Sequence, residues 1–386
     1  MRKVAIVGVG MTRFGQLWDR SLVSLAVEAG IKAVRDAGVH QGDVGVMYGG
    51  TMSGGLFVNQ EHLGSMFADH AGFKHIPSIR VEAACASGGL ALRQAHMDVA
   101  SGTHDIAVVG GVEKMTDLSS STVSRALATA ADTEREGIFG ATFPGIYALM
   151  ARLHMHKYHT REEEMADVAV KNHEFAVHNP LAHFQKRITI DDVMASPKIA
   201  DPLKLLDASP VSDGAAAIVL ASEEKARELT DTPVWIRGSG HATDSIALHD
   251  RKDLLTLQAT VHATKQALSQ AGMRLKDIQM AEVHDCFTIA ELLALEDIGF
   301  VPRGSAGSFT IDGQTRIGGQ IPINPSGGLK AKGHPVGASG IAQAIEAVLQ
   351  LRGDAGKRNT GAENALCQNV GGSGGTAVVH ILSREP

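Results

Sequence analysis

The chain has 386 residues, of which 44% are hydrophobic and 20% charged, proportions typical of a folded protein rather than a disordered one. Its formal net charge of −6 argues against a general binder of nucleic acids or anionic membranes. No apolar run approaches the roughly 18 residues of a transmembrane helix, and neither end carries a targeting signal. Three cysteines do not make a disulfide framework, so we expect a reducing, cytoplasmic setting.

The first thirty residues predict a strand followed by a helix. Residues 3–8 (KVAIVG) form a run rich in β-branched residues that ends in glycine. The following segment, SLVSLAVEAGIKAVRDAG, predicts a helix that ends at Gly38. Its apolar stripe consists of Leu22, Leu25, Ala26, Ala29 and Ala33. Together with few aromatic residues and many glycines and alanines, this pattern favours an α/β fold with helices packed closely on sheets.

The second half of the chain repeats the first in three places. A shift of 234 residues aligns the first helix with LQATVHATKQALSQAG. A shift of 252 aligns residues 86–88 with 338–340, both Ala-Ser-Gly, and a shift of 161 aligns residues 214–216 with 375–377. Because the last two shifts differ by 91, the first half must contain about that many extra residues. We therefore expect two similar α/β halves with a long insertion in the first.

These matches predict the domain boundaries. Residues 1–117 and 208–230 form the first half, residues 118–207 the insertion, and residues 231–386 the second half. The insertion is rich in His and Met and interrupted by prolines, and a loop domain of this size is usually functional.

Several familiar signatures are incomplete. Gly8-Val9-Gly10 follows a strand, but Arg13 stands where a dinucleotide-binding turn has its third glycine. Residues 328–333 have the spacing of a phosphate-binding loop, but His334-Pro335 replaces the residues that hold phosphate and metal. Histidines 154, 156 and 159 could hold a metal, although solvated or ligand-contacting roles fit better. We expect no metal, no nicotinamide cofactor and no nucleotide hydrolysis.

Cys85 lies in the segment EAACASGG, directly before the helical pattern LALRQAHMDVA. Small neighbours place this thiol at a strand-to-helix junction. There we expect the helix N-terminus to lower the pKa of the thiol and to supply a backbone N–H for an oxyanion. A buried structural cysteine is the alternative.

Two further segments place reactive side chains beside tight turns. In AEVHDCFT, Cys286 lies two residues after His284 at the end of a predicted strand. In NPSGGLKAKGHPVGASG, glycines, prolines and small residues surround His334. The duplication sets Gly337 where the first half has Cys85, so the pseudo-twofold symmetry should bring His334 close to Cys85.

The ordered motifs VEAACASGG, AVVGGVEKM, DASPVSDGAAA, HDCF, NPSGGLKAKGHPVGASG and QNVGGSGG resemble the thiolase superfamily along nearly the whole chain. HDCF in place of Asn-Glu-Ala-Phe resembles the branch of the sterol carrier protein-x thiolases and archaeal acetyl-CoA acetyltransferases. The resemblance implies the thiolase fold, in which two duplicated βαβαβαββ halves form a layered α-β-α-β-α sandwich with a loop domain inserted in the first half.

The resemblance also implies a role for each matching residue. Cys85 matches the acylated nucleophile, and His334 matches the base that takes its proton. His284 falls where an asparagine orders a water that, together with His334, forms one oxyanion hole. The backbone N–H groups of Cys85 and Gly371 match the second hole.

One motif departs from the common pattern. Residues 369–371 (Asn-Val-Gly) stand where most thiolases have a Cys-x-Gly motif whose cysteine removes the α-proton of the incoming acetyl group. Cys367 lies two residues earlier, about 7 Å away along a strand. In the HDCF branch the motif's own cysteine replaces that acid/base, which favours Cys286 over Cys367.

The resemblance further implies that CoA lies over the insertion. Ser209 matches a serine that contacts pantetheine, and His156 and Met155 are looser candidates. Among the basic residues, Lys186, Arg187 and Lys204 are not distinguished by the sequence as phosphate ligands.

The predicted function is that of an acyl-CoA C-acyltransferase, which condenses two acetyl-CoA to acetoacetyl-CoA and catalyses the reverse thiolysis. CoA is a substrate here, and no cofactor is expected. The alternatives are a retro-aldolase acting on CoA esters, a non-catalytic acyl-CoA-binding subunit or lipid carrier, and a condensing enzyme of the fatty-acid type. We expect a homodimer or homotetramer, with neither nucleic acid nor membrane as partner. The resemblance allows hydroxymethylglutaryl-CoA synthase and a zinc-ribbon/OB-fold protein as partners.

Overall fold

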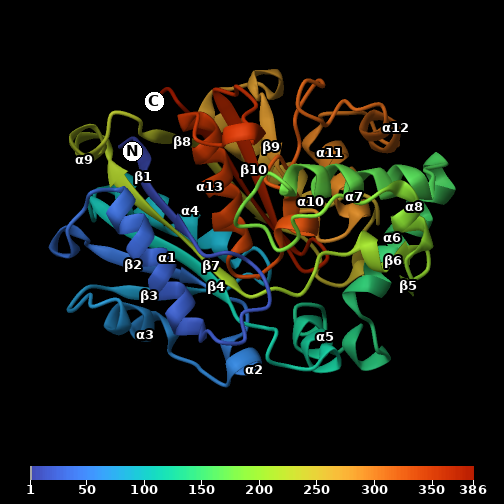
Figure 1. Cartoon of the computed structure of the whole chain (residues 1–386), viewed down its shortest axis with the longest axis horizontal. Coiled ribbons are helices and arrows are strands. Elements are labelled where there is room, and N and C mark those ends of the chain that lie inside the picture. Colours follow the sequence, from blue (N-terminus) through green and yellow to red (C-terminus); the bar gives the residue numbers. More distant parts are fainter. Residues whose placement is uncertain (1) are drawn as a thin grey trace.

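A computed structural model describes residues 2–386 (Figure 1). The first half contains β1 (Val4–Met11), α1 (Leu22–Asp36), β2 (Val46–Gly50), α2 (Gly54–Val58), α3 (Leu63–His70), β3 (Ser78–Val81), α4 (Ser87–Ser101), β4 (Ile106–Glu113), β7 (Gly214–Ser222) and α9 (Glu223–Leu229). Between β4 and β7 lie α5 (Ser120–Ala128), α6 (Phe143–Tyr158), α7 (Glu162–Ala176), α8 (Ile190–Ala195), β5 (Lys198–Ala200) and β6 (Leu203–Lys204). The second half contains β8 (Val234–Thr243), α10 (Gln258–Ala271), β9 (Met280–Glu282), α11 (Thr288–Ile298), α12 (Ala306–Ile311), α13 (Ser339–Arg352), β10 (Asn364–Gly371) and β11 (Thr376–Ser383).

The strand order displays the predicted duplication. Hydrogen-bonded strands follow the order β3-β2-β4-β7-β1-β8-β11-β10-β9. Counted outward from the centre of the sheet, the strands of the first half are β1, β7, β4 and β2, and their counterparts in the second half are β8, β11, β10 and β9. Strands β1 and β8 pair only at Ala5–Trp235 and Ile6–Val234, so the hydrogen-bonded junction between the two halves of the sheet is very short. The expected α/β architecture with two related halves is therefore confirmed.

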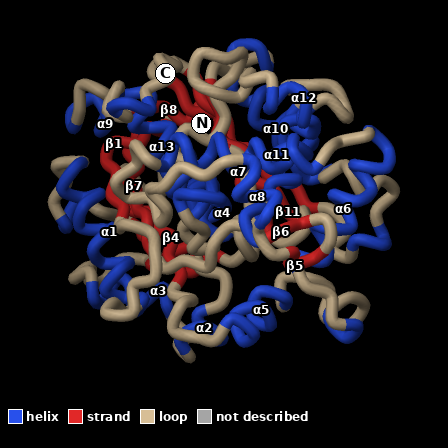
Figure 2. The backbone as a smooth tube through the Cα atoms, turned by 45° about the vertical axis from the view of Figure 1, so that its right-hand side comes forward, coloured by secondary structure: helices blue, strands red, loops and turns tan. Residues whose placement is uncertain are grey.

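Successive side chains of the strands point to opposite faces of the sheet and pack against different helix layers. On β1, Ala5 and Val7 pack with α1 on the outer face, whereas Val4 and Ile6 pack with α4 and α13. Helices α4 and α13 therefore lie between the two parts of the sheet, while α1 and α10 cover the outer faces. Figure 2 shows strands running through the middle of the molecule with helices on both sides. This arrangement is the expected α-β-α-β-α sandwich.

Glycines on the first strand of each half permit close helix packing. A Cβ on Gly10 of β1 would lie 2.3 Å from the Ala29 carbonyl oxygen of α1. A Cβ on Gly240 of β8 would lie 1.9 Å from the Ala263 carbonyl oxygen of α10. The glycines at positions 8 and 10, which resemble part of a dinucleotide turn in the sequence, thus serve helix–sheet packing.

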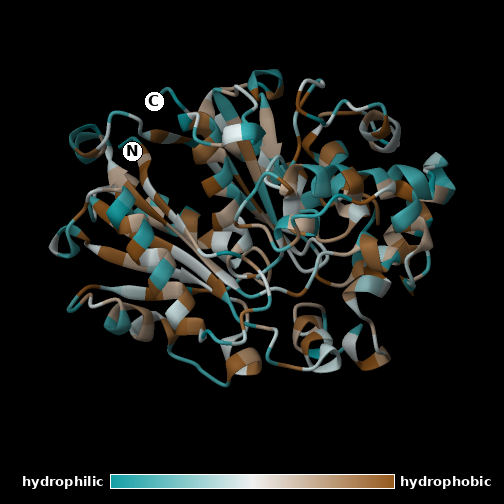
Figure 3. Ribbon diagram, viewed as in Figure 1, coloured by the Kyte–Doolittle hydropathy of each residue, from teal (hydrophilic) through white to brown (hydrophobic). Residues whose placement is uncertain are grey.

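The predicted first helix forms as expected. It begins at Ser21, whose side chain accepts a hydrogen bond from the Ser24 N–H, and Gly38 beyond its end adopts a φ of 65°. The apolar stripe is buried except for Ala26, which is partly exposed. Figure 3 shows hydrophobic colours along the strands and hydrophilic colours on the exposed turns of α7 and α8.

The insertion packs against the second half. Helix α6 buries Ile146, Tyr147 and Met150 in the same core as Phe287 and Leu292 of the second half. This contact places part of the insertion directly over the HDCF segment. None of the helices in residues 2–386 is both long and apolar enough to cross a membrane.

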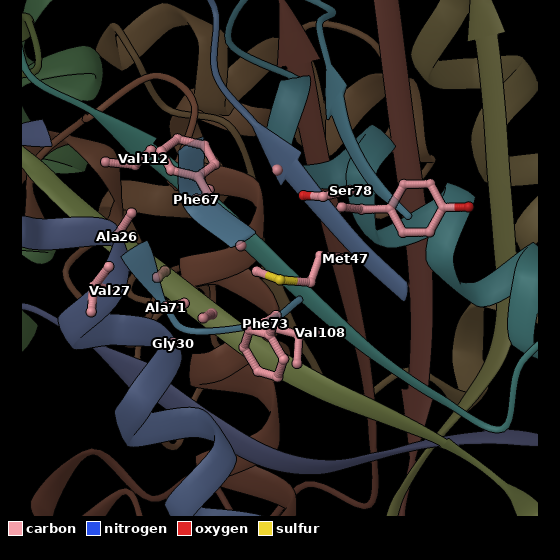
Figure 4. A pocket seen from close by; sticks show the side chains of 16 residues that line it. Ala26, Val27, Gly30, Met47, Phe67, Ala71, Phe73, Ser78, Val108 and Val112 are labelled. Carbon is pink, nitrogen blue, oxygen red and sulfur yellow. The ribbon is translucent and has the colours of Figure 1, made fainter. Parts of the chain in front are cut away.

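A small cavity lies between α1, α3 and the outer face of the first-half strands (Figure 4). Its volume is about 40 Å³, and Ala26, Met47, Phe67 and Phe73 line it. Its walls carry no thiol, imidazole or carboxylate. The cavity is therefore a gap in packing and offers no catalytic group.

Candidate active site

A second pocket, of about 200 Å³, opens where the two halves meet the insertion. Its walls combine reactive groups with apolar side chains. They comprise Cys85, Ser120, Val123, Ser124, Leu127, Phe143, Pro144, Tyr147, Ala208, Ser209, Val211, Cys286, Phe287, His334, Val336 and Gly372. Four residues predicted from the sequence, Cys85, Cys286, His334 and Ser209, therefore meet in one cavity.

Cys85 stands on a strained turn just before α4. The preceding residue, Ala84, has a φ of 50°, a left-handed conformation that alanine rarely adopts. The Ser87 hydroxyl stabilises this turn, because it accepts from the Ala83 N–H at 2.9 Å and donates to the Ala84 carbonyl at 2.6 Å. The turn directs the Cys85 sulfur into the pocket.

The Cys85 thiol is neutral in this setting. Burial raises its pKa to about 12, although the Gly372 N–H close to the sulfur acts in the opposite direction. Backbone N–H groups at this turn do lower the pKa, as expected, but desolvation of the thiolate outweighs them, so the pKa as a whole is raised rather than lowered. A nearby base must remove the proton as the sulfur attacks.

His334 is the imidazole next to this thiol. Its Nδ1 lies 2.7 Å from the Ser339 hydroxyl, which donates its own proton to the Pro335 carbonyl. The hydroxyl therefore accepts from Nδ1–H, and the lone pair resides on Nε2. Burial lowers the pKa of His334 to about 3, so the ring is a neutral base.

His284 completes a compact group with Cys85 and His334. One ligand atom of each residue lies within 4.8 Å of the others, which confirms the predicted approach of His334 to Cys85. The two rings meet edge to face with centroids 5.1 Å apart. Burial and the His334 ring hold the pKa of His284 well below its usual value. Its Nε2 is buried and has no protein partner, so it is available to a ligand.

Cys286 faces the same pocket from the segment after β9. Burial raises the pKa of its thiol, and the nearby hydroxyl of Tyr147 partly opposes that rise. Tyr147 also donates to the Gly372 carbonyl at 3.1 Å, and its ring packs on Phe287 with centroids 4.9 Å apart. Tyr147 thus connects the second thiol to the loop that faces Cys85.

Asp285 holds the loop that leads to His334. Its carboxylate accepts from the N–H groups of Leu329 and Lys330, at 2.7 and 3.1 Å, and from the Asn172 amide at 2.7 Å. Burial, followed by the nearby Glu291 carboxylate, raises the pKa of Asp285 to about 7. This buried carboxyl holds the loop at Leu329 and Lys330 in place and does not line the pocket.

Four residues named from the sequence lie elsewhere. Cys367 is buried beside α13, and its thiol donates to the Gln343 carbonyl at 3.5 Å, away from the pocket. Met155 and His156 lie eight and nine residues along α6 from Tyr147, roughly 12 Å or more at 1.5 Å per residue, and do not line the pocket. Gly371 belongs to β10 and faces Thr376, whereas the N–H close to the Cys85 sulfur is that of Gly372.

Several side chains of the site are not evident from the sequence. Tyr147 lies in an insertion without a motif, and only the fold brings it against Phe287. Ser339 belongs to the repeated Ala-Ser-Gly, so its spacing of five residues from His334 is a signal that could identify it. Asn369 carries a motif position, but its contacts to Cys85 and His284 require the folded chain.

Potential metal ligands gather at one place in residues 2–386, namely Cys85, His284 and His334. The histidines of the insertion do not form such a group. His154 is buried against Thr160 and Glu296, at 2.7 and 3.3 Å.

Comparisons with known proteins agree with these features. The model of the thiolase N-terminal domain matches residues 4–224, and that of the thiolase C-terminal domain matches residues 240–384. The acetyl-CoA acetyltransferase of Methanothermobacter thermautotrophicus is 56% identical over the full length of both chains, and that of Methanocaldococcus jannaschii is 48% identical over 99% of both. Sterol carrier protein 2 of Gallus gallus is 36% identical over 99% of this chain and 72% of its own.

A solved structure extends the likeness to three dimensions. The Ltp2-ChsH2(DUF35) aldolase superposes with a TM-score of 0.85 at 28% identity, covering 99% of this chain and 97% of that one. Two family models together match most of the chain, and relatives well above 30% identity cover it end to end. The chain therefore belongs to the thiolase family.

Proposed function

We propose that the protein is an acetyl-CoA C-acetyltransferase, which condenses two acetyl-CoA to acetoacetyl-CoA and catalyses the reverse thiolysis. One observation carries the proposal: two thiols and a neutral imidazole line one pocket, with a second imidazole in contact with the first. Two full-length relatives that bear this name support it.

The first half-reaction acylates Cys85. His334 Nε2 takes the thiol proton while the sulfur attacks the thioester carbon of acetyl-CoA. The N–H groups of Cys85 and of the turn at Gly371 and Gly372 hold the developing oxyanion, and the Gly372 N–H also lies beside the sulfur. His334 then returns the proton to the departing CoA thiolate, which leaves acetyl-Cys85.

The second half-reaction forms the carbon–carbon bond. The Cys286 thiol first gives its proton to His334, the neutral imidazole that lines the same pocket. The resulting thiolate removes an α-proton from a second acetyl-CoA, and the buried Nε2 of His284 donates to the enolate oxygen. The enolate carbon attacks acetyl-Cys85, which yields acetoacetyl-CoA and releases the Cys85 thiolate. The thiolate takes the proton held by His334, and Cys286 keeps the α-proton, so both thiols and the imidazole return to their starting state. Tyr147 supports Cys286 when its hydroxyl turns from the Gly372 carbonyl to the sulfur, because a donor there stabilises the thiolate.

The insertion supplies the substrate cleft in this proposal. Its helices α5 and α6 contribute Ser124, Leu127 and Phe143 to the pocket, which argues for residues 118–207 as the CoA- and acyl-binding unit. Ser209 lines the pocket and donates its backbone N–H to the Cys286 carbonyl at 2.9 Å, a position suited to pantetheine contact. The chemistry uses thiols and imidazoles alone, so CoA acts as a substrate and no cofactor takes part.

A second candidate function is a retro-aldolase acting on CoA esters. The superposed Ltp2-ChsH2(DUF35) aldolase favours it, and that assembly also supports a further protein as partner of this chain. An aldolase has no need of an acylated cysteine, whereas here Cys85 and Cys286 share one pocket.

A thiolysis assay separates the two functions. Purified protein is mixed with acetoacetyl-CoA and CoA, and the loss of enolate absorbance is followed together with acetyl-CoA formation by chromatography. Two acetyl-CoA per acetoacetyl-CoA consumed support the proposal. Absence of thiolysis, together with cleavage of a β-hydroxyacyl-CoA to an aldehyde or ketone, supports the aldolase instead.

We further place the protein in the cytoplasm as at least a homodimer. Strand β3 lies at one edge of the sheet and pairs only with β2 among the described residues, and Ile79 on it is 43% exposed. Such an edge suits pairing with a second copy. Sedimentation at micromolar concentration tests the proposal, and a mass near the single-chain 40.6 kDa contradicts it.

A further inference from the structure

Asn369 occupies a niche between the N-termini of the two central helices. A Cβ added to Gly340 would lie 2.2 Å from its Oδ1, and one added to Gly89 would lie 2.9 Å from the same atom. The absence of side chains at both glycines therefore makes room for this amide, which is buried.

Two backbone groups fix the orientation of the Asn369 amide. Its Oδ1 accepts from the Gly89 N–H at 3.2 Å, and its Nδ2 donates to the Cys85 carbonyl at 3.1 Å. A flipped amide would set a donor against the Gly89 N–H and an acceptor against the Cys85 carbonyl. Only one orientation satisfies both.

The fixed amide also determines the protonation of His284. Its Nδ2 lies 3.2 Å from His284 Nδ1, and because Nδ2 is a donor, Nδ1 must accept. A neutral imidazole carries one proton, which therefore resides on Nε2. That buried Nε2 has no protein partner, and the His284 ring belongs to the group formed with Cys85 and His334.

We propose that Asn369 is a positioning residue that holds His284 as its Nε2–H tautomer, so that the site presents a hydrogen-bond donor and rejects a transition-metal ion. A ligand of Zn²⁺ must offer a lone pair, and the Nε2–H form of His284 offers none. Without Asn369, Cys85, His334 and His284 would provide three donors of a tetrahedral site. The inference deepens the proposed function, because the enolate oxygen needs this N–H.

The informative substitution is Asn369→Asp. It keeps the acceptor for the Gly89 N–H, gives up the hydrogen bond to the Cys85 carbonyl, and sets a carboxylate oxygen against His284 Nδ1, which must then carry the proton. Nε2 becomes a lone pair, as in other carboxylate–histidine pairs. The matched control is Gln368→Glu, since the Gln368 side chain accepts from the backbone N–H of His284 at 2.8 Å and does not touch the ring.

Three readouts distinguish a tautomer from a merely structural role. Histidine ¹⁵N NMR, assigned with His284→Ala, reports which nitrogen is protonated. Visible spectra after Co²⁺ addition report thiolate coordination. Stopped-flow kinetics separate Cys85 acetylation by acetyl-CoA from thiolysis of acetoacetyl-CoA. The first two do not depend on catalysis, so they remain decisive if the proposed function itself fails.

We expect wild type and Gln368→Glu to show the Nε2–H tautomer and no cobalt–thiolate band. Asn369→Asp should show Nδ1–H, bind Co²⁺ at Cys85, and lose thiolysis by a factor on the order of 10², the effect of removing one oxyanion donor, with acetylation far less affected. An unchanged tautomer in Asn369→Asp, or a wild type that binds Co²⁺ as tightly, overturns the proposal. If Asn369→Asp does not fold, Asn369→Ala serves, and persistence of a pure Nε2–H tautomer in it would likewise overturn the inference.

Discussion

The N-termini of α4 and α13 have the same local sequence but serve two different functions in the site. Both begin with Ala-Ser-Gly, at 86–88 and 338–340, and they lie against each other, since a Cβ on Gly88 would be 2.6 Å from the Gly337 carbonyl. In α4 the serine stabilises the strained turn that presents Cys85. In α13 the equivalent Ser339 accepts a hydrogen bond from the His334 ring. Duplication thus places a nucleophile and its base face to face, and single residues assign the roles.

The largest effect is expected from the nucleophile itself. Cys85→Ser should abolish turnover, because an imidazole cannot ionise a hydroxyl of far higher pKa in this buried turn. Mass spectrometry after exposure to acetyl-CoA should find the acetyl group on the Cys85 peptide of the wild type and none in the variant. An acetyl group on Cys286 or Cys367, with Cys85 unmodified, would show that Cys85 at the start of α4 is not the nucleophile.

The second thiol should matter for only one of the two half-reactions. Cys286→Ala is expected to lose thiolysis of acetoacetyl-CoA by a factor on the order of 10² or more, while Cys85 still becomes acetylated. Cys367→Ala is the matched control and should affect mainly stability, because this thiol is packed in the core and donates to the Gln343 carbonyl away from the pocket. Rapid-quench kinetics measure both steps. The reverse result, with Cys367 essential and Cys286 dispensable, would transfer the acid/base role to Cys367.

Replacing each of the two equivalent serines by alanine tests whether they have different roles in the two helices. Ser339→Ala should lower the acetylation rate of Cys85 by about tenfold, because His334 loses the partner that keeps its lone pair on Nε2. The loss should be smaller than a full acid–base contribution of roughly 10²–10⁴-fold, since the imidazole itself remains. Ser87→Ala should instead cost about 1–2 kcal/mol of unfolding free energy, since two buried hydrogen bonds disappear. Denaturant unfolding and single-turnover kinetics on both variants test this division. Equal effects on rate and stability would contradict it.

The smallest effect concerns pH. Burial lowers the pKa of His334 to about 3, so the base stays neutral well below pH 6.5. Between pH 6.5 and 5.5 the acetylation rate should change less than twofold, whereas an imidazole with an ordinary pKa near 6.5 would lose about fivefold of its neutral form. Stopped-flow acetylation rates across this interval distinguish a lowered from an ordinary pKa of His334. A fivefold fall would mean that the His334 ring is hydrated in solution.

Much of the fold could be predicted from the sequence alone, since it follows from local chemistry and repetition. The strand and helix at the start, the repeated Ala-Ser-Gly and the extra residues of the first half are all visible in the order of residues, because periodicity and glycine positions act locally. The approach of His334 to Cys85 followed from the symmetry of the duplication.

Only the tertiary structure decided what burial and packing determine. The pKa of Cys85 rises because the folded chain takes most of the thiol out of bulk water, a property that no neighbour in the sequence reveals. Tyr147 meets Cys286 because α6 crosses the HDCF segment, and Asn369 meets His284 because β10 runs beside β9. Contacts between segments more than 80 residues apart depend on how layers stack, whereas a motif records only which residues are adjacent along the chain.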